Sequence, residues 1–417
     1  MQQSGQRSPW YYVPTLYFAE GLPYILINSV SVVLYKSLGI SNERIGLWTS
    51  MLYLPWVIKM VWAPAVDLYA TKRGWLVASQ LLLGFVFMGA AVALAGGNFF
   101  FPSLVLFAAG AFVSATHDIA VDGFYMLALT EKEEAYYVGI RVVAYRLAMI
   151  FGSGGLVYAA GKASAVMPVN LAWALAMFVP GLLFAGFYVW HRFVLPRPAV
   201  DCAKPVGRKS EGFFEAIAAY FRQEKIVVIL LFILLYRFGE ALLMKMASPF
   251  LMDSAAAGGL GVTTSEIGIL YGTVGMIALI LGGIIGGWIL ARYGLKKCVW
   301  PMTIALNLPD LFYCWLAHVK LAGVMLYPLI ALEQFGAGLG FMAFTVFLMS
   351  IGDERYRTSH FAISTGLMGL GMMLPGMVSG YMQNTLGYAG FFWFVIAVTV
   401  PGMLLIPFIP VKARAVP

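Results

Sequence analysis

The sequence predicts an all-α membrane protein with twelve spanning helices in two six-helix halves. Of its 417 residues, 61% are hydrophobic and only 11% are charged, which gives too little polar surface to coat a water-soluble globule of this size. The apolar residues stand in long runs, and such runs favour spanning helices over the alternating pattern of a membrane barrel.

Twelve runs reach the length of about 20 apolar residues that a helix needs to cross a bilayer. They lie at 14–35, 45–64, 75–95, 101–127, 138–161, 169–190, 226–251, 264–290, 298–317, 323–350, 358–383 and 387–409. With both termini in the cytoplasm, the loops of the opposite side hold only Lys36, Arg44, Lys162 and Lys320, and the other loop cations are cytoplasmic. This asymmetry predicts the orientation, because cytoplasmic loops retain an excess of basic residues. The net charge of +8 has the same origin, so we expect no nucleic-acid partner.

The long polar connection at 191–225 separates an N-terminal bundle at 1–190 from a C-terminal bundle at 226–417. It carries prolines and basic residues, falls between the sixth and seventh spans, and is expected to be a cytoplasmic linker. A short basic loop recurs in both halves: Asp67, Arg73 and Gly74 follow the second span, and a similar loop at 291–297 follows the eighth. Its recurrence at matching places indicates a duplicated six-helix unit.

Ionisable residues inside the spans are the main pointers to function, because each costs roughly 2.5 to 3.5 kcal/mol on insertion scales. The deep acids are Glu20 in the first span, Asp118 and Asp122 in the fourth, Glu240 in the seventh and Glu333 in the tenth; the accompanying cations are Lys59, Arg141, Arg146, Arg237 and Lys245. Asp310 in the ninth span stands apart. Since Asn307 and Pro309 adjoin it, we assign it to a local break in that helix.

Asp118 and Asp122 are four residues apart and therefore share one helix face. Counted by the helical rise, Arg146 and Arg141 on the fifth span come level with them. We expect Asp122 and Arg141 to form a structural ion pair. We expect Asp118 to alternate between binding a proton and pairing with Arg146, which would couple protonation to substrate binding. His117 is expected to be a packed, neutral imidazole.

Other positions leave two interpretations open. Arg237 and Glu240, three residues apart, neutralise each other, or Arg237 binds an anionic ligand while Glu240 holds a proton. Lys59 snorkels to the inner surface or faces a cavity. Glu20 precedes Gly21-Leu22-Pro23, where we expect a helix break that exposes backbone carbonyls.

The basic loop with Asp67 and Arg73 resembles that of the major facilitator superfamily. The chain also resembles the AmpG-type muropeptide permeases from end to end. The stretches that carry this likeness are Gly21-Leu22-Pro23; Lys59 with Trp62, Pro64, Asp67 and Arg73-Gly74-Trp75; Asp118-Ile119 with Asp122; Tyr145-Arg146-Leu147; Tyr236 with Gly239; and Glu333 with Gly338 and Gly340. Glu240, Gln334 and His117 depart from the pattern, which has aspartate, asparagine and glutamine there.

The resemblance implies a major facilitator fold in which the first, fourth, seventh and tenth helices line a central cavity. It implies a proton symporter of the bacterial inner membrane that imports disaccharide anhydromuropeptides for peptidoglycan recycling by alternating access, or else another amphiphilic organic anion such as a coenzyme A ester or a nucleotide-linked solute. On this basis we expect proton coupling at Asp118, Glu240, Glu20 and Glu333; substrate binding at Arg146, Arg237, Lys59, Tyr145, Gln334 and Asn28; a charge network of Asp122 and Arg141; and a conformational latch of Asp67 and Arg73.

Catalytic and nucleotide-binding patterns are absent from the sequence. It contains no HExxH, no GxSxG and no P-loop, and its four histidines and three cysteines have no metal-ligand spacing. We therefore expect no enzyme, no ATP-driven pump, no cofactor and no metal. The expected partners are a small-molecule substrate, protons and membrane lipid, and the expected functional form is a monomer.

Overall fold

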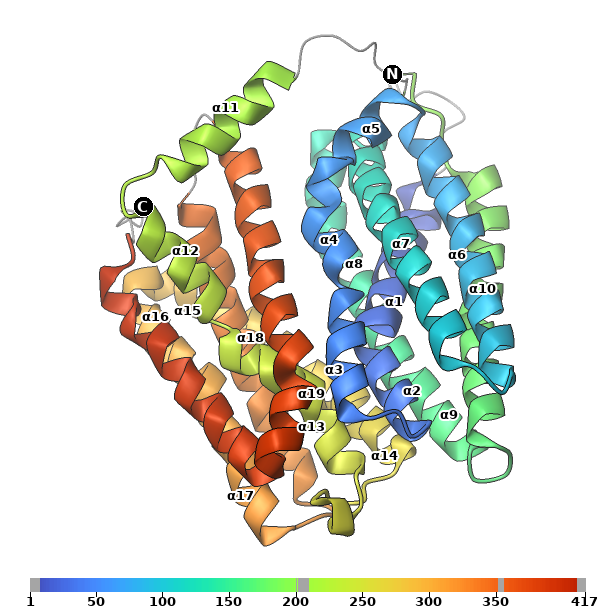
Figure 1. The fold of residues 1–417 in the computed structure, drawn as a ribbon. Coiled ribbons are helices and arrows are strands. Elements are labelled where there is room, and N and C mark those ends of the chain that lie inside the picture. Colours follow the sequence, from blue (N-terminus) through green and yellow to red (C-terminus); the bar gives the residue numbers. More distant parts are fainter. Residues whose placement is uncertain (1–7, 200, 202–209, 352–355, 411–417) are drawn as a thin grey trace. The chain divides into compact units, whose positions relative to one another are not determined.

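The computed structural model describes residues 8–199, 201, 210–351 and 356–410. The described residues form helices and no strand (Figure 1). They group into two compact units: residues 1–38 with 58–206, and residues 39–57 with 207–417. The start of the second span therefore packs with the C-terminal helices, although the sequence order puts it in the N-terminal half. Both chain ends lie outside the described residues, so the side of the membrane on which they lie stays a prediction.

The helices of the first unit follow five of the predicted spans and the end of a sixth. They are α1 (Val13–Ile25), η2 (Leu26–Val30) and α2 (Ser31–Ser37); η3 (Lys59–Val61) and α5 (Ala63–Leu68); α6 (Lys72–Ala95); α7 (Phe100–Ala128); α8 (Glu131–Ile150), η4 (Phe151–Leu156) and α9 (Val157–Ala163); and α10 (Val169–Val194). α6 lies between α7 and α10, and α1 packs against α8 and α7 (Figure 1). Tyr17, Leu76 and Phe124 belong to the buried core of this unit.

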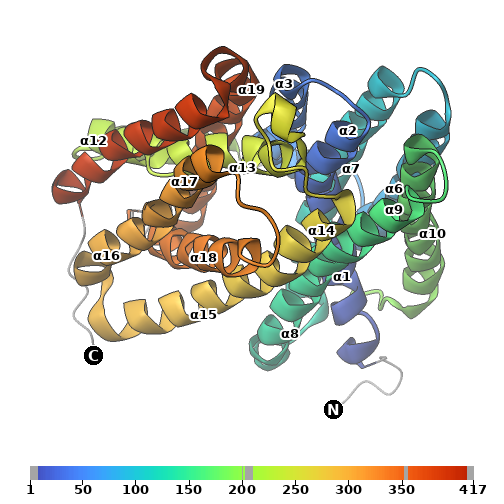
Figure 2. The same cartoon turned by 90° about the horizontal axis from the view of Figure 1, so that it is seen from below.

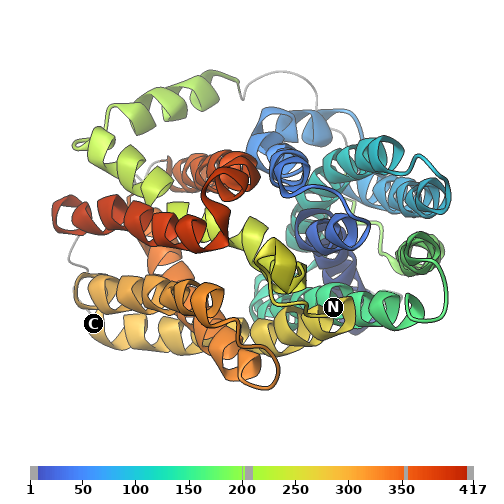
Figure 3. The ribbon, with the colours of Figure 1, turned by 60° about the horizontal axis from the view of Figure 1, so that its bottom comes forward.

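The second unit contains helices from seven of the predicted spans and the linker. They are α3 (Asn42–Met51) and α4 (Leu54–Ile58), which ends at the unit boundary; α11 (Ser210–Phe221); α12 (Ile226–Leu235) and α13 (Phe238–Met252); α14 (Thr264–Ile269), η6 (Leu270–Gly275) and α15 (Met276–Tyr293); α16 (Leu295–Asn307), η7 (Leu308–Asp310) and α17 (Leu311–Val319); α18 (Leu326–Ser350); and α19 (Arg357–Leu404) with η9 (Ile406–Phe408). α18 lies beside α15 and α16 (Figure 2 and Figure 3), and α19 packs against α13 and α3. Phe232 and Phe347, with ring centroids 4.8 Å apart, lie in its core.

Nine helices of the described residues are long and apolar enough to cross a membrane. One of the nine holds two predicted spans, so the second and the ninth are the two spans that remain. The second is divided into short helices, with Pro55 and Pro64 among them, and the ninth is divided at η7, where Pro309 lacks the N–H that a continuous helix needs. The last two lie within α19, which contains a non-helical residue at Gly387 (φ 65°). The twelve-helix prediction is thus consistent with the structure.

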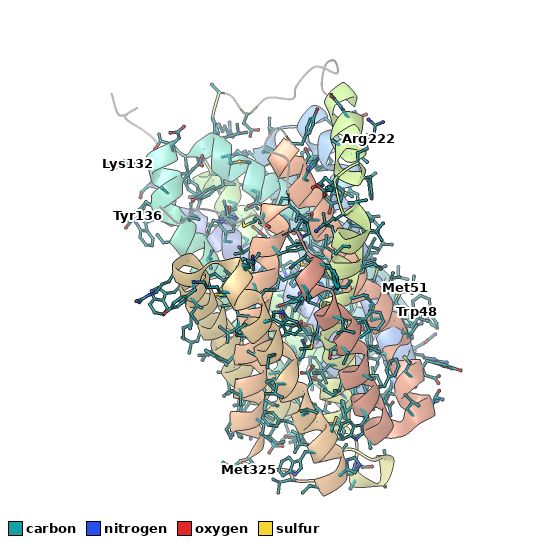
Figure 4. The ribbon with its side chains drawn as sticks, turned by 90° about the vertical axis from the view of Figure 1, so that its left-hand side faces the viewer. Trp48, Met51, Lys132, Tyr136, Arg222 and Met325 are labelled. Atoms are coloured by element: carbon teal, nitrogen blue, oxygen red, sulfur yellow. The ribbon has the colours of Figure 1, made fainter. Side chains whose placement is uncertain are left out.

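The outer faces of the helices suit a lipid environment. Phe85, Val92, Val105 and Trp288 are large apolar side chains that remain well exposed, and faces of this kind are stable only against lipid or a partner. Lys132 and Tyr136 project outward from the first turns of α8 (Figure 4), and Tyr136 is 63% exposed. A charged and aromatic helix end is typical of a membrane interface.

Candidate functional site

The first unit contains a group of charged side chains that we call the N-terminal charge cluster: Glu20, Lys59, Asp118, Asp122 and Arg141. Its central contact joins the Nζ atom of Lys59 to Oδ2 of Asp118 over 3.6 Å. Lys59 reaches α7 from η3, where the second span tightens into a 3₁₀ turn. Trp62 fixes this turn, because its indole N–H donates to Oγ1 of Thr116 on α7 over 3.2 Å.

The expected ion pair between Asp122 and Arg141 is present, with 3.5 Å between Oδ1 and Nη2. The same carboxylate oxygen accepts a 3.2 Å hydrogen bond from the hydroxyl of Tyr17 on α1. The guanidinium carbon of Arg141 lies 4.7 Å from the ring centroid of Tyr17 and 5.2 Å from that of Tyr125, distances at which cation–π attraction operates. This pair therefore joins α1, α7 and α8.

The expected partnership of Asp118 with Arg146 is wrong. The Nη1 atom of Arg146 contacts the sulfur of Met149 at 3.5 Å, while Asp118 pairs with Lys59. Five residues separate Arg146 from Arg141, which turns the two side chains roughly 140° apart around α8. Equal depth in the membrane does not put Arg146 on the face that Arg141 uses.

Glu20 adds to the N-terminal charge cluster a carboxyl group with one unsatisfied oxygen. Its Oε2 atom is buried and has no hydrogen-bond partner among the described residues. The charges of Asp118, Asp122, Lys59 and Arg141 all act on it. A carboxyl with an unsatisfied buried oxygen is poorly suited to carry a full negative charge.

The predicted helix break beside Glu20 is wrong in position. α1 continues through Gly21 and Pro23 to Ile25, and the irregular turn is the π-helix η2 that follows. Gly21 has a packing function instead, because a Cβ atom there would lie 2.8 Å from the carbonyl oxygen of Tyr145. Tyr145 thus packs on α1. Asn28 lies in η2, and its amide donates to the carbonyl of Tyr24 over 3.0 Å.

A buried hydrogen-bonded chain crosses the first unit. The amide nitrogen of Gln80 lies 3.1 Å from Nε2 of His117, and its amide oxygen accepts a 2.9 Å hydrogen bond from Nδ1 of His191. The Nε2 atom of His191 is hydrogen-bonded to Oγ1 of Thr15 over 2.9 Å, so the chain links α7, α6, α10 and α1. His117, Gln80 and His191 have no exposed surface. Of these hydrogen-bonded residues, only His117 was a candidate from the sequence. His191, assigned to the linker, lies inside α10, which extends to Val194.

The second unit contains a group of acids that we call the C-terminal carboxyl cluster: Glu240, Asp310 and Glu333. Arg237 holds Glu240 through two hydrogen bonds of 2.6 and 2.5 Å, which is the mutual neutralisation considered as one alternative for this pair. Glu333 is 7% exposed. Its Oε2 accepts a 3.1 Å hydrogen bond from the hydroxyl of Tyr313, and its Oε1 accepts one of 2.8 Å from Gln334.

Tyrosines extend the C-terminal carboxyl cluster beyond the residues that the sequence indicated. The hydroxyl of Tyr271 in η6 hydrogen-bonds to that of Tyr313, which in turn donates to Glu333. Asp310 is buried in the expected break of the ninth span. Tyr271 and Tyr313 gave no signal in the sequence, because aromatic residues are common throughout the spans.

The side chain of Asp67 lies outside what the structure describes, so its part in a latch stays a prediction. Arg73 binds the end of α10, donating to the carbonyls of Arg192 at 2.6 Å and Leu195 at 3.4 Å. Asp201 caps α6 by accepting from the backbone N–H groups of Lys72 and Arg73 at 2.7 and 3.0 Å. In the described state Arg73 therefore ties α6 to α10.

Comparison with known proteins is consistent with this architecture. The family model of the Major Facilitator Superfamily matches residues 15–352. The anhydromuropeptide permease of Escherichia coli K12 is 27% identical over 404 residues, covering 93% of this chain and 77% of the relative. A Rickettsia conorii protein with AmpG 4 in its name is 25% identical over 408 residues, covering 95% of each. Among solved structures, a D-xylose-proton symporter has the same fold, with a TM-score of 0.74 at 12% identity over 96% of this chain and 97% of that one. The chain therefore belongs to the Major Facilitator Superfamily as a multi-pass membrane transporter, and its resemblance to AmpG-type permeases is confirmed.

Proposed function

We propose that this transporter imports anhydromuropeptides across the bacterial inner membrane by alternating access, together with protons. The observation that carries the proton coupling is the contact between Asp118 and Lys59 beside the partly unsatisfied Glu20. The proposed substrate rests on the similarity to a relative named anhydromuropeptide permease. We further propose that the transporter works as a monomer with both termini in the cytoplasm.

The pair of Asp118 and Lys59 suits an exchange of partners. The Lys59 side chain is 39% exposed and that of Asp118 is 12% exposed, so a ligand can reach the cation more easily than the acid. While Asp118 is ionised, it neutralises Lys59. When Asp118 takes up a proton, the charge of Lys59 becomes available to a carboxylate of the cargo.

This exchange couples the two binding events in both directions. Protonation of Asp118 favours binding of an anion at Lys59, and the bound anion in turn favours protonation of Asp118. The local charge is the same before and after loading, because one proton and one carboxylate enter together. That neutrality lowers the electrostatic cost of moving a loaded site through a low-dielectric membrane.

Chemical complementarity also supports the proposed substrate. An anhydromuropeptide combines a disaccharide, rich in hydroxyl groups, with peptide carboxylates. Lys59, Arg146 and Arg237 are candidate partners for the carboxylates, and Tyr145, Asn28 and Gln334 are candidate partners for the sugar. Glu240 is the proposed proton carrier that would release Arg237 in the same way as Asp118 releases Lys59.

Uptake into proteoliposomes tests this function. With an acidic exterior, the purified protein should accumulate radiolabelled anhydromuropeptide above its external concentration, and an agent that collapses the proton gradient should abolish the accumulation. Coenzyme A esters and nucleotide-linked solutes serve as competitors. Competition by those compounds without accumulation of anhydromuropeptide would assign the carrier to another class of organic anion.

The coupling role of Asp118 requires its own variant. Asp118→Asn should lose accumulation but retain exchange of labelled for unlabelled substrate, because exchange needs no net proton movement. Asp122→Asn is the matched control on the same face of α7. Equal accumulation by Asp118→Asn and the wild type would remove Asp118 from the coupling.

A further inference from the structure

Among the residues that the structure describes, the charges that act on the carboxyl group of Asp310 are those of other acids. Asp310 ends η7, the short 3₁₀ turn between α16 and α17, and is only 4% exposed. Its Oδ2 atom is buried and has no hydrogen-bond partner in the described part of the chain. Because an isolated carboxylate in a buried site costs several kcal/mol, the neutral acid is the form that this position tolerates.

The groups around Asp310 strengthen this requirement. Glu333 on α18 and Glu240 on α13 act on it as like charges. Arg237, the cation of the C-terminal carboxyl cluster, is bound to Glu240 by two hydrogen bonds. From α16 comes Asn307, which is uncharged and also has a buried oxygen without a partner among the described residues. The titratable neighbours from α17 and η6 are Tyr313, Cys314 and Tyr271.

Asp310 and Glu333 receive unequal support from hydrogen-bond donors. Glu333 accepts from both Tyr313 and Gln334, and such donors stabilise a carboxylate. Tyr313 follows Asp310 by three residues, which places the two on neighbouring positions of one helical face, yet its hydroxyl is directed to Glu333. Of two interacting acids, the one that lacks such donors holds its proton more tightly.

We propose that Asp310 is a proton-binding site of the C-terminal unit, which holds its proton in this conformation. Its use in transport rests on the proton coupling proposed above. A change in the hydrogen bonds of Tyr313 or Gln334 to Glu333 would alter the affinity of Asp310 for its proton. Through these hydrogen bonds, a rearrangement of α18 would control the uptake and release of the proton by Asp310 in the ninth span.

Infrared spectroscopy tests the site without any knowledge of the substrate. The full-length protein in lipid nanodiscs is titrated through neutral pH, and the carbonyl band of protonated carboxyl groups is followed. The spectrum of Asp310→Asn should lack one component of this band, whereas that of Glu333→Gln should retain it. An unchanged band in Asp310→Asn, or its loss in Glu333→Gln, would overturn the proposal. Should Asp310→Asn fail to fold, the Glu333→Gln spectrum still decides.

Transport measurements separate the site from the proposed function. Asp310→Asn should exchange substrate across the membrane but fail to concentrate it, and full accumulation by this variant would overturn the role of Asp310 in coupling. A wild type that concentrates no anhydromuropeptide, combined with the infrared change in Asp310→Asn, would contradict the substrate assignment and support the proton site.

Discussion

The Nζ atom of Lys59 lies 3.6 Å from Oδ2 of Asp118, and the lysine is the more exposed partner. This contact exists because the second span tightens into a 3₁₀ turn at Lys59–Val61 and Trp62 anchors that turn to α7. An irregular helix thus places a cation beside an acid of the fourth span. The arrangement separates the two roles expected of a symport site, with the proton on one residue and the anion on the other.

Lys59→Gln should weaken substrate binding, because the glutamine keeps hydrogen-bonding capacity but has no charge. We expect the KM for an anionic cargo to rise about tenfold, which corresponds to roughly 1.4 kcal/mol of binding free energy. Initial rates of uptake at varied substrate concentration measure this change. Lys162→Gln is the control, since that ammonium contacts the ring of Tyr158 at 5.6 Å. An unchanged KM in Lys59→Gln would contradict anion binding at this residue.

Asp122→Asn should affect stability more than transport. The substitution removes the contact with Arg141 and weakens the hydrogen bond from Tyr17. Because the Asp122 side chain is 47% exposed, solvent screening limits the loss to about 0.5 to 1 kcal/mol. Thermal unfolding in detergent should shift down slightly while concentrative uptake persists. Loss of accumulation with normal stability would show that Asp122, and not only Asp118, takes part in coupling.

The helices and the ion pair of Asp122 with Arg141 could be predicted because each depends on one regular feature. Apolar runs of spanning length identify helices, and the helical rise brings Asp122 level with Arg141. The partner of Asp118 could not be predicted in the same way. Arg146 has the right depth and the wrong rotation, while Lys59 depends on an irregular turn in the second span.

The hydrogen-bonded chain through Gln80 shows a second limit of sequence reasoning. Gln80 is uncharged, so it drew no attention among the ionisable residues of the spans. His191 falls in the predicted linker, because apolar composition decreases there. Only the rotation of four helices about their axes brings Thr15, Gln80, His117 and His191 together, and composition carries no information on that rotation.

Gly21→Ala should destabilise the contact between α1 and α8. The added Cβ would lie 2.8 Å from the carbonyl oxygen of Tyr145, and relief of such overpacking typically costs about 1 to 3 kcal/mol. Gly139→Ala is the control on α8, because a Cβ there meets nothing within 4 Å. Thermal unfolding should separate the two variants. Equal midpoints would contradict a close crossing at Gly21.

Gln80→Leu should destabilise the first unit strongly. Leucine matches the volume of the side chain but leaves a ring nitrogen of His117 and one of His191 without partners, and both rings are fully buried. Each unsatisfied buried group costs about 1 to 3 kcal/mol, so for two groups we expect a loss of about 2 to 6 kcal/mol in the free energy of unfolding. His117→Gln retains a hydrogen-bonding group at this position, and it should be milder. Thermal unfolding monitored by intrinsic tryptophan fluorescence measures both effects. A Gln80→Leu variant as stable as the wild type would mean that the hydrogen bonds of Gln80 make no net contribution to the stability of the fold.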